Sequence, residues 1–590
     1  MEFRTMNRAD LPQVMEIIAQ AQRGLRLQGI DQWQDGYPDV PTLEADIQAH
    51  NAWVAEEAGQ VAGCVVISFD GEPNYDSMVE GRWKEEGDYA VIHRIAVCEQ
   101  WKGQGVAGQM LRLAEKLCAQ RQVEIIRVDT HRDNRPMRRL LEKNGYHYRG
   151  VIRLSRDQSL RVAYEKNRRE TMDRAEREWE LLNRIGFERV GGTEQEEKAA
   201  EILRQEAQRI GARTVVEAFE VQDQIVHRVE CRTPDRTFPA TAYGCGGVTG
   251  EEGLTAGFSY MEYPDAVSRA DAKGKIVLVN GYLSYKLYQE IVSAGAVGFI
   301  TYSGEMRDRD EDTDLVSREM RPQLAELAQL PGVHLRIQDA FDLVRDNPET
   351  VTLTVCQTKT TGRSHNVIAQ LDGSDRADEV IVLTAHYDSV QTSTGVYDNG
   401  AGSVILMELL RSFALHRPRR TLRFIWCGSE ERGLLGSHAY VQQHREQLDA
   451  IRLNINADVA GAVQGHDSAW CLGEDDLPAM VRSLARECGF VVEVKRDVYS
   501  SDEVPFSDLG IPSVSFMRFG ERGANYIHNR HDVLRYLSPQ SLARTTDFIE
   551  QFLRRIDQAE VFPLERSVPQ DQKEKIDLYL NRKTKEDQSC

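Results

Sequence analysis

Several features are missing from this sequence of 590 residues, and each absence excludes a class of protein. None of the ten cysteines forms a CxxC pair, so buried, reduced thiols are expected in place of a disulfide framework. No apolar run approaches the length of a membrane span, which predicts that no membrane is involved. The charged N-terminus lacks the apolar segment of a signal peptide, which favours a cytoplasmic location.

Positive charge is also scarce, because 73 Lys and Arg face 93 Asp and Glu, for a net charge of -20. This balance argues against general binding of nucleic acid, which depends on neutralising phosphates. The remaining composition, with 41% apolar and 28% charged residues, is that of an ordinary globular protein. The length predicts roughly three to five domains and leaves the oligomeric state open.

The first 166 residues have the pattern of an α/β domain. Strand-like runs, a glycine-rich turn and helical segments alternate along residues 1–166. The strands are expected at 52–57, 61–69, 89–97 and 125–131, the turn at 102–108, and helices at 110–120 and 136–145.

The rest of the chain divides by composition into four parts. Residues 167–221 are expected to form a linking helix and the start of a second domain, with Thr193 as the N-cap of a helix and Glu196 completing a capping box. Residues 222–358 are rich in glycine loops and short strands and are expected to form a mostly β insert. Strands and helices alternate in 359–560, which predicts a largely parallel sheet with helices on both faces. Residues 561–590 are polar and are expected to be a loose tail.

Five residues of metal-binding type stand in order in the C-terminal half: His386, Asp398, Glu431, Asp458 and His528. They lie in the phrases TAHYDS (384–389), VYDNGAG (396–402), GSEERGLLGS (428–437), NADVAG (456–461) and IHNRHD (527–532). A single His or Asp is more often a surface or capping residue. Together, two imidazoles and three carboxylates suit a pair of zinc ions, because zinc accepts N and O ligands and catalytic zinc keeps a position open for water. The set therefore predicts a hydrolase.

The local order suggests how these residues divide the work. His386 and Asp388 are two apart at the end of a strand, so both side chains point the same way and Asp388 can hold the second ring nitrogen. Asp398 precedes a helix and can bridge two metals. Glu430 and Glu431 are adjacent at a strand-to-helix turn, where one can bind zinc while the other moves the proton of the attacking water.

Residues of about 170–560 resemble the di-zinc aminopeptidase family that includes bacterial leucyl aminopeptidases, aminopeptidase Y and glutamate carboxypeptidase. The matching phrases are AHYDS, DNGAG, GSEERGLLGSHAYV, NADVAG, SDEVPFSDLGIPSVSF and HNRHD. The resemblance implies that His386, Asp398 and Asp458 hold one zinc, and that Asp398, Glu431 and His528 hold the other. It implies Glu430 as general base, Asp388 as support for His386, and a protease-associated insert in 222–358.

The sequence departs from this family at two places. Many members have a Tyr beside the last His to stabilise the oxyanion, whereas here Ile527 is adjacent, and Tyr499 and Tyr526 are the candidates. The Ser-Asp phrase often continues with His, whereas this chain has Glu503. We take His531 as a bystander and place His438 on a helix face.

The turn KGQGVAG (102–108) can cradle a pyrophosphate, because backbone N–H groups at a helix N-terminus are free and glycines allow close approach. Glycines in such a turn can also serve only to reverse the chain. In context, residues 1–166 resemble the GNAT acetyltransferases, with Lys102 in the first place of their Arg/Gln-x-x-Gly-x-Gly/Ala pattern and Asn134 through Gly145–Tyr146 as their later phrase. The resemblance implies an acetyl-CoA site at Ile95, Val97, Lys102, Gly103, Gly105, Val106, Ala107, Gly108 and Asn134.

One departure bears on the acetyl transfer itself. The family commonly has a Tyr seven residues after the Asn to protonate the leaving thiolate, and here that position is Leu141. Water or another side chain would have to serve, and His93 is a candidate base or a packed strand residue. A non-catalytic acetyl-CoA sensor is therefore an alternative for this domain.

The sequence as a whole predicts an α/β protein in which a GNAT-like mixed-sheet domain precedes a three-layer zinc-peptidase domain with an insert. The predicted function is a fusion of an acetyl-CoA-dependent N-acetyltransferase, acting on a small amine, with a two-zinc aminopeptidase acting on peptides. Two alternatives keep the peptidase fold. One is glutaminyl cyclisation, for which related enzymes use one zinc. The other is a non-catalytic receptor or scaffold, which would be expected to lack the ligands and base present here. The residue preference is not predicted, and carboxypeptidase action is not excluded.

Overall fold

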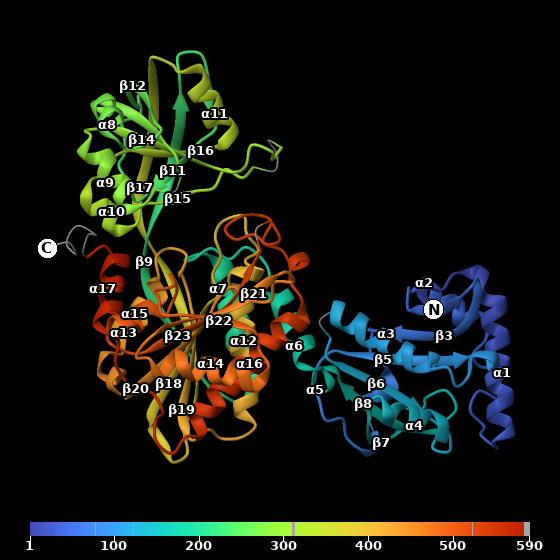
Figure 1. The fold of residues 1–590 in the computed structure, drawn as a ribbon. Helices are drawn as coiled ribbons and strands as arrows, with labels where there is room; N and C mark the ends of the chain where they lie inside the picture. The colour runs from blue at the N-terminus through green and yellow to red at the C-terminus, as the bar shows by residue number, and fades with distance from the viewer. Residues whose placement is uncertain (77, 122, 282, 310–312, 522, 583–590) are drawn as a thin grey trace. The chain divides into compact units, whose positions relative to one another are not determined.

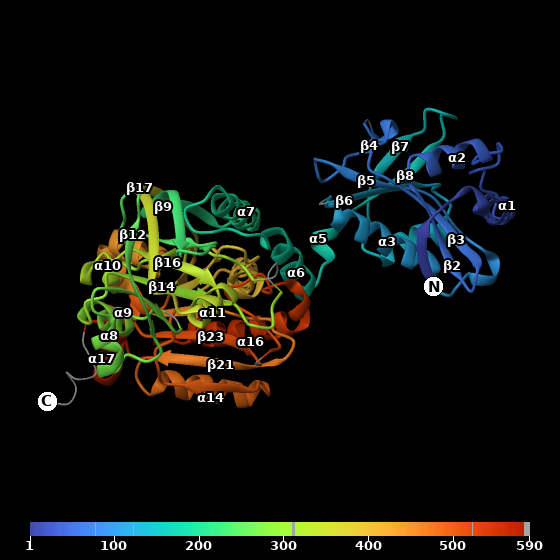
Figure 2. The ribbon, with the colours of Figure 1, turned by 90° about the horizontal axis from the view of Figure 1, so that it is seen from above.

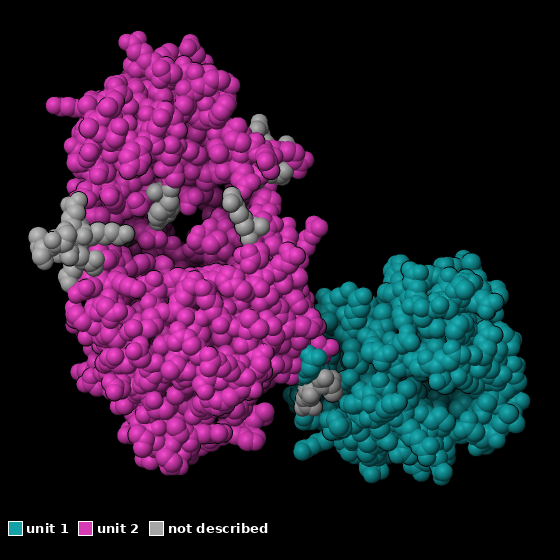
Figure 3. All heavy atoms as spheres, in the orientation of Figure 1, with its two compact units in different colours: residues 1–173 teal, residues 174–590 magenta. Residues whose placement is uncertain are grey.

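The computed structural model describes residues 1–590 except for residues 77, 122, 282, 310–312, 522 and 583–590. The chain forms two compact units, Met1–Asp173 and Arg174–Cys590, which Figure 3 shows in different colours. Within the described residues, no helix combines the length and the apolar character that crossing a bilayer requires.

An eight-stranded mixed sheet forms the first unit, in the order β1-β2-β3-β5-β6-β8-β7-β4 (Figure 1). Its strands are β1 (Glu2–Thr5), β2 (Ala52–Glu57), β3 (Gln60–Ser68), β4 (Met78–Gly81), β5 (Tyr89–Val97), β6 (Ile125–Thr130), β7 (His147–Arg153) and β8 (Leu160–Asn167). Its helices are α1 (Leu11–Leu27), α2 (Val40–Gln48), α3 (Val106–Gln120), α4 (Arg135–Lys143) and α5 (Arg168–Thr171). The expected α/β domain is confirmed.

Strands β5 and β6 run parallel but stay paired along only part of their length. Their register extends from Tyr89–Ile125 to Ile92–Val128 and then stops, although β5 continues to Val97. At the same point, the pairing of β3 with β5 slips by a bulge, and Arg94 has a φ of 49°. A bulge of this kind bends one strand away from its neighbour. The sheet therefore opens between β5 and β6 and leaves room for a ligand.

The second unit is built on a large sheet whose centre is the parallel set β19-β18-β20-β23. The strands are β17 (Thr350–Leu371), β18 (Arg376–His386), β19 (Arg420–Cys427), β20 (Ile451–Ala457), β21 (Gly465–Leu472), β22 (Val492–Lys495) and β23 (Ser513–Gly520). β17 and β21 lie antiparallel at the two sides of this set. The parallel centre places several strand ends at one edge, where a site can form.

Helices cover both faces of this sheet, as expected. One face packs against α6 (Arg174–Ile185), α7 (Glu194–Ile210), α12 (Ala401–Ala414), α14 (Asp476–Cys488) and α16 (Pro539–Gln558). The other packs against α13 (Leu435–Gln443) and α15 (Val504–Asp508). Figure 2 shows α14 lying along β21. The buried stripe of α6, with Leu181, Leu182 and Ile185, joins the largest hydrophobic cluster of this unit.

Two long antiparallel strands, β9 (Arg213–Arg232) and β17, lead from this sheet into the insert. The insert contains β10 (Thr237–Phe238), β11 (Thr241–Gly244), β12 (Leu254–Met261), β13 (Lys275–Val279), β14 (Gly298–Ser303), β15 (Arg318–Glu319) and β16 (Gly332–Arg336). It also contains α8 (Ala266–Ala272), α9 (Tyr285–Ser293), α10 (Pro322–Leu327) and α11 (Ile337–Asp346), and its apolar residues form separate clusters.

The capping box expected at the start of α7 does not form. Thr193 does cap α7 by accepting from Glu196 N at 3.3 Å, but Glu196 does not complete a capping box. Its carboxylate accepts instead from Gly192 N at 2.7 Å and from Ser429 N at 3.0 Å. The start of the helix is buried against the loop that contains Ser429, and this burial decides the partners of Glu196.

The C-terminal segment is not loose throughout its described length. Helix α17 (Gln570–Tyr579) packs Ile576 in a small apolar cluster and buries Gln572. The side chain of Gln572 accepts from Gly473 N at 2.7 Å and donates to Cys471 O at 3.2 Å. The packing of Ile576 and the hydrogen bonds of Gln572 hold this helix against the domain, although most residues of the segment are polar. The part of the expected tail at 583–590 lies outside the described residues.

Candidate active sites

The five residues expected to bind metal come from different elements but meet at one edge of the parallel sheet. His386 ends β18, and Asp398 lies in the turn of residues 396–400 that leads into α12. Glu431 follows β19 and Asp458 follows β20, whereas His528 is in the loop after β23. The carboxyl ends of parallel strands are where ligand sites collect in open α/β sheets.

These side chains form two groups of three that share Asp398. His386, Asp398 and Asp458 form one group, and Asp398, Glu431 and His528 form the other, with donor atoms within 4.8 Å of one another in each. His386 Nε2 lies 3.2 Å from Asp398 Oδ1, and His528 Nε2 lies 3.1 Å from Asp398 Oδ2. The two oxygens of Asp398 therefore face the two different imidazoles, as a bridging carboxylate must.

The donor set fits a divalent metal, and the atoms around it are otherwise unsatisfied. Glu431 Oε1 and Asp458 Oδ1 are buried and have no hydrogen-bond partner. Burial raises the pKa of Glu430 well above its ordinary value, and Glu431 adds to this by repulsion. Burial alone would lower the pKa of His528, but Glu431 and Asp398 raise it to about 11. Such a concentration of buried negative charge is unfavourable without cations.

The two groups differ in access to solvent. The side chain of His386 is 1% exposed, whereas that of His528 is 49% exposed. The second group therefore lies at the mouth of the site, where a substrate can reach it, and the first lies at its floor.

Asp388 contacts both His386 at the end of β18 and the backbone of Glu430 and Glu431 after β19. Its Oδ1 lies 3.4 Å from His386 Nδ1 and accepts a hydrogen bond from Glu430 N at 3.0 Å. Its Oδ2 accepts from Glu431 N at 3.2 Å. One buried carboxylate thus orients the imidazole and holds the turn of the two glutamates. Glu430 Oε2 lies 3.8 Å from His386 Nε2, beside the metal group.

Sequence reasoning missed two residues that hold the bridging carboxylate in place. Asp532 accepts from Tyr397 N at 2.8 Å and from Asp398 N at 3.1 Å. Arg189 is fully buried and donates to the carbonyls of Phe187, Tyr387, Thr394 and Gly395. The phrase HNRHD contained Asp532, but an aspartate at a loop gave no sign of its partners. Arg189, in the charged linker, gave no sign at all.

Glu196 is a third residue whose place the sequence did not reveal. Its Oε1 accepts from Ser429 N at 3.0 Å and from Ser364 Oγ at 2.7 Å. Ser429, which has a φ of 52°, immediately precedes Glu430. Burial raises the pKa of Glu196 to about 8, and Asp388 adds to the shift.

The two tyrosines considered for the oxyanion lie in different surroundings. Tyr499 packs against Trp470 and Phe519, with ring centroids 5.7 and 5.8 Å away. Burial raises the pKa of Tyr499 well above its ordinary value, and the charges of Asp458 and Asp398 add to this. The ring of Tyr526 instead lies 5.4 Å from that of His531.

Glu503, at the position where relatives often have His, is buried and belongs to neither metal group. Its Oε2 accepts from Asn456 Nδ2 at 3.2 Å, and burial raises its pKa to about 8. His438 lies on α13, as expected, and is set apart from both metal groups.

The loop that carries His528 contacts the insert through an ion pair between Arg530 and Asp314, and Arg432 binds Glu319 at 2.7 Å.

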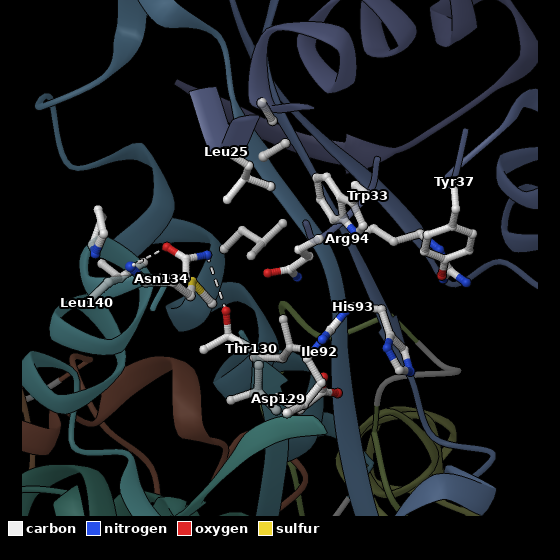
Figure 4. Close-up of a pocket in the computed structure, with 18 of the residues that line it drawn as sticks. Leu25, Trp33, Tyr37, Ile92, His93, Arg94, Asp129, Thr130, Asn134 and Leu140 are labelled. Carbon is white, nitrogen blue, oxygen red and sulfur yellow. Dashed lines mark hydrogen bonds between the residues drawn. The ribbon is translucent and has the colours of Figure 1, made fainter. Parts of the chain in front are cut away.

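In the N-terminal unit, a cavity of about 690 Å³ opens where β5 and β6 separate (Figure 4). Four residues of the expected acetyl-CoA site line it: Ile95, Val97, Lys102 and Asn134. Asn134 also caps α4, because its Oδ1 accepts from Met137 N at 3.2 Å, while its Nδ2 donates to Thr130 Oγ1 at 3.2 Å.

The glycine-rich turn begins α3 as expected, with the helix starting at Val106. Gly103 and Gly105 have φ values of 78° and 82°, in the left-handed region that favours glycine. A Cβ at either position would meet no atom within 4 Å, so the space above the turn is open. Val106, Ala107 and Gly108 form the first turn of α3, whose N–H groups have no partner within the helix.

Two features of the cavity bear on acetyl transfer. His93 Nε2 lies 3.4 Å from Glu72 Oε2, and both residues line the cavity with Asp129. Burial lowers the pKa of His93 to about 4, with Arg94 adding to the shift, so its imidazole is neutral near pH 7. Leu141 is completely buried in the core, so its position supplies no proton donor.

Comparison with known proteins assigns both units. Residues 366–553 match Peptidase family M28, and residues 12–146 match the Acetyltransferase (GNAT) family. Aminopeptidase YwaD of Bacillus subtilis is 28% identical over 380 residues, which cover 61% of this chain and 79% of that protein. Leucine aminopeptidase 2 of Trichophyton rubrum is 32% identical over 209 residues, covering 35% of this chain and only 40% of its own length.

Solved structures agree with this assignment. A crystal structure of BSAP, a zinc aminopeptidase from Bacillus subtilis, superposes with a TM-score of 0.56 at 25% identity, covering 67% of this chain and 98% of that one. The aminopeptidase from Aneurinibacillus sp. strain AM-1 shares the fold, with a TM-score of 0.53 at 22% identity, covering 66% and 96%. The fold and site thus define a zinc aminopeptidase domain joined to an acetyltransferase domain. In this chain an M28 peptidase domain follows a GNAT domain, and both families are enzymes.

Proposed function

We propose that the second unit is a two-zinc aminopeptidase. The observation that carries this proposal is the pair of three-residue groups that share Asp398 and face the mouth and the floor of one site. His386, Asp398 and Asp458 would hold one ion, and Asp398, Glu431 and His528 the other. When bound, such ions polarise the scissile carbonyl and lower the pKa of water, which is the chemistry of peptide hydrolysis.

Other residues of the chain would carry the remaining steps. Glu430 would take a proton from the attacking water and pass it to the leaving amine, since its carboxylate lies beside the metal groups and its N–H is held by Asp388. Asp388 would keep His386 in the right tautomer. Tyr499 would donate to the developing oxyanion, because Asp458 and Asp398 are among the groups that raise the pKa of its hydroxyl.

A screen of aminoacyl-anilides and short peptides, with and without chelator, tests this proposal. We expect hydrolysis at the N-terminal bond that chelator abolishes and zinc restores. Glu430→Gln should abolish turnover while leaving zinc content nearly intact, and Glu446→Gln, at an exposed position, is the matched control. Loss of zinc from Glu430→Gln would mean that the roles of Glu430 and Glu431 are exchanged. One tightly bound zinc, with pyroglutamate formed from Gln-peptides, would contradict the proposal in favour of a cyclase.

We also propose that the first unit transfers acetyl groups from acetyl-CoA to an amine. The support is the opening between β5 and β6, which Ile95, Val97 and Lys102 line next to the free N-terminus of α3. The pyrophosphate would lie on the first turn of α3, at Gly105 to Gly108, and Gly103 would allow the approach. Asn134 would contribute from the start of α4.

Calorimetry with CoA and an acetylation assay over a broad amine panel separate an enzyme from a sensor. An acetyltransferase should bind CoA and turn over at least one amine. Binding without turnover of any amine would favour an acetyl-CoA sensor, because Leu141 offers no proton to the thiolate. Gly105→Val should weaken CoA binding, since valine disfavours a φ of 82°.

The proposal also covers the location of the protein in the cell and the nature of the insert. We infer a cytoplasmic location, because acetyl-CoA is an intracellular substrate. We also infer that the insert is a protease-associated domain at the substrate cleft, supported by the contacts of Asp314 and Glu319 with the core.

A further inference from the structure

The cavity of the N-terminal unit contains a buried cation without a carboxylate at contact distance. Arg161, on β8, lines the cavity and is 3% exposed. Its side chain donates one hydrogen bond, to Leu160 O at 3.2 Å, and within the described part of the chain no carboxylate oxygen lies within 4.0 Å of it. Asp129 and Asp157 interact with Arg161 only from beyond that distance. A ligand that brings a negative charge into contact with this buried guanidinium would therefore stabilise it.

The other guanidinium groups of the cavity differ in this respect. Arg94 pairs with Asp46 at 3.1 Å, and Arg156 pairs with Asp35 at 3.2 Å. The nitrogens of Arg161 that make no hydrogen bond are not sealed within protein, so they are open to the cavity. Of the three guanidinium groups that line the cavity, Arg161 is thus the one available to an incoming anion, and Lys102 lies at the turn that suits the pyrophosphate.

The position of Arg161 indicates which ligand carries that anion. The turn 102–108, which suits the pyrophosphate of CoA, follows β5, whereas β8 lies on the far side of β6. The pairing of Asp129 with Ala163 puts Asp129 and Arg161 on the same face of the sheet, because Arg161 is two residues from Ala163. Figure 4 shows Asp129 and His93 among the residues that line the cavity. The anion beside Arg161 therefore belongs to the acceptor.

The same part of the cavity provides groups for an amine. Asp129 uses Oδ1 to accept from Tyr75 Oη at 2.8 Å and lines the cavity beside His93. Glu72 lies 3.4 Å from His93 and can stabilise the imidazolium once it forms. His93 and Arg161 are on strands that flank β6, which puts their backbones at least about 10 Å apart. Two long side chains and a compact zwitterion between them can span such a distance.

We propose that the acceptor is a free α-amino acid, whose carboxylate binds Arg161 and whose amino group lies beside Asp129 and the Glu72–His93 pair. This inference rests on the proposed acetyltransferase function. The ammonium gives one proton to His93, and its nitrogen attacks the thioester carbonyl carbon. The C–N bond forms and the C–S bond breaks, the electron pair leaving with sulfur. The nitrogen loses its second proton, the thiolate takes up one, and the proton on His93 returns to solvent.

The proposal also places the two halves in one reaction sequence. Hydrolysis of an N-terminal peptide bond by the second unit releases a free amino acid. That product has the amine and the carboxylate that the cavity of the first unit fits. The fusion would thus join a reaction that produces amino acids to one that acetylates them.

The test compares free amino acids with their amides, which keep the amine and lose the negative charge. In the full chain carrying Glu430→Gln, which keeps the second unit from hydrolysing the amide to the acid, and with acetyl-CoA, we expect kcat/KM for the acid to exceed that for the amide by about 10- to 100-fold, as one charged hydrogen-bonded contact is worth. Arg161→Met should remove this difference, mainly by raising KM for the acid, and should leave the amide within about twofold. The amide rate reports that the variant is folded. Arg153→Met, on the exposed part of β7, is the matched control.

Calorimetry gives a second readout that does not depend on turnover. With CoA present, we expect the amino acid to bind the wild-type chain with a heat that Arg161→Met loses, whereas any binding at the peptidase site is unchanged. Equal turnover of acids and amides, unaffected by Arg161→Met, would overturn the inference and leave the acetyltransferase standing. Arg161-dependent binding without acetylation would keep the amino-acid site and overturn the transferase. Absence of both would overturn the inference.

Discussion

Replacement of Arg189 by Met is expected to weaken the fold and the metal site together. The guanidinium donates to four backbone carbonyls, those of Phe187, Tyr387, Thr394 and Gly395. Tyr387 stands between His386 and Asp388, and Thr394 and Gly395 precede Asp398 in the sequence. Its backbone N–H also donates to Ser389 Oγ at 3.0 Å. Arg189 therefore ties together the two loops that carry His386 and Asp398.

The loss in the free energy of unfolding can be estimated from the carbonyl groups that lose their partner in Arg189→Met. Burial lowers the pKa of Arg189 to about 10, so the group is charged near pH 7, and acids including Asp388 and Asp532 stabilise that charge. Each buried carbonyl left without a partner costs about 1–3 kcal/mol, and relief from burying the charge offsets part of the sum. We expect a net loss of about 3–5 kcal/mol. With about 2.1 cal/mol/K per residue over roughly 420 residues, Tm should fall by about 3–6 °C.

Thermal unfolding of the metal-free full chain measures this effect, with Arg213→Met as control because Arg213 is exposed on β9. The control should change the free energy of unfolding by less than about 0.5 kcal/mol. A zinc titration should show a 10- to 100-fold loss of affinity in Arg189→Met, as for residues that orient ligands. The reasoning would be refuted if Arg189→Met matched the control in both Tm and zinc affinity.

Three further predictions concern single side chains. Asp388→Asn should reduce zinc affinity about 10- to 100-fold, because it removes an acceptor from Glu430 N or Glu431 N and from His386; competition with a chromogenic chelator measures this. Tyr499→Phe should lower kcat about 10²- to 10³-fold with little change in KM, as expected for loss of an oxyanion donor. Glu178→Gln should raise stability at neutral pH, because burial raises the pKa of Glu178 well above the ordinary 4.5 and its Oε2 has no partner. An acid with a raised folded-state pKa stabilises most below pH 4.5 and less as pH rises, so the gain in Tm should grow from pH 5 to pH 8.

Each of these has an outcome that contradicts it. Unchanged zinc affinity in Asp388→Asn would show that His386 is oriented without it. Equal kcat in Tyr499→Phe would remove that residue from the reaction and leave Tyr526 as the candidate. A Tm gain in Glu178→Gln that is constant from pH 5 to pH 8 would mean that Glu178 is ionised in the folded chain throughout this range, so that burial does not raise its pKa.

Much of the fold could be predicted because the relevant signals are local. Buried parallel strands appear as apolar runs such as EVIVLTAH, and each run ends where a ligand residue stands, so the alternation of strands and helices was enough to gather His386 and Glu431 at one sheet edge. The turn before α3 was visible from its glycines, two of which have a positive φ.

Residues that act across the chain could not be predicted in the same way. Glu196 matched the local pattern of a capping box, yet it binds Ser429, more than two hundred residues away, since burial of the helix start decides its partner. Arg161 lies on an ordinary strand, and only the structure shows that it lines a cavity without a carboxylate at contact distance among the described residues. The helix of the C-terminal segment was hidden by its polar composition because two buried residues are enough to anchor it.

Metal content per chain tests the central claim most directly. Elemental analysis of the full chain after dialysis against zinc should give two ions for the wild type and fewer than one for Asp398→Ala, because this aspartate belongs to both groups. Asp378→Ala, which is exposed near the start of β18, should keep both ions. Two ions retained by Asp398→Ala, or none bound by the wild type, would contradict the account.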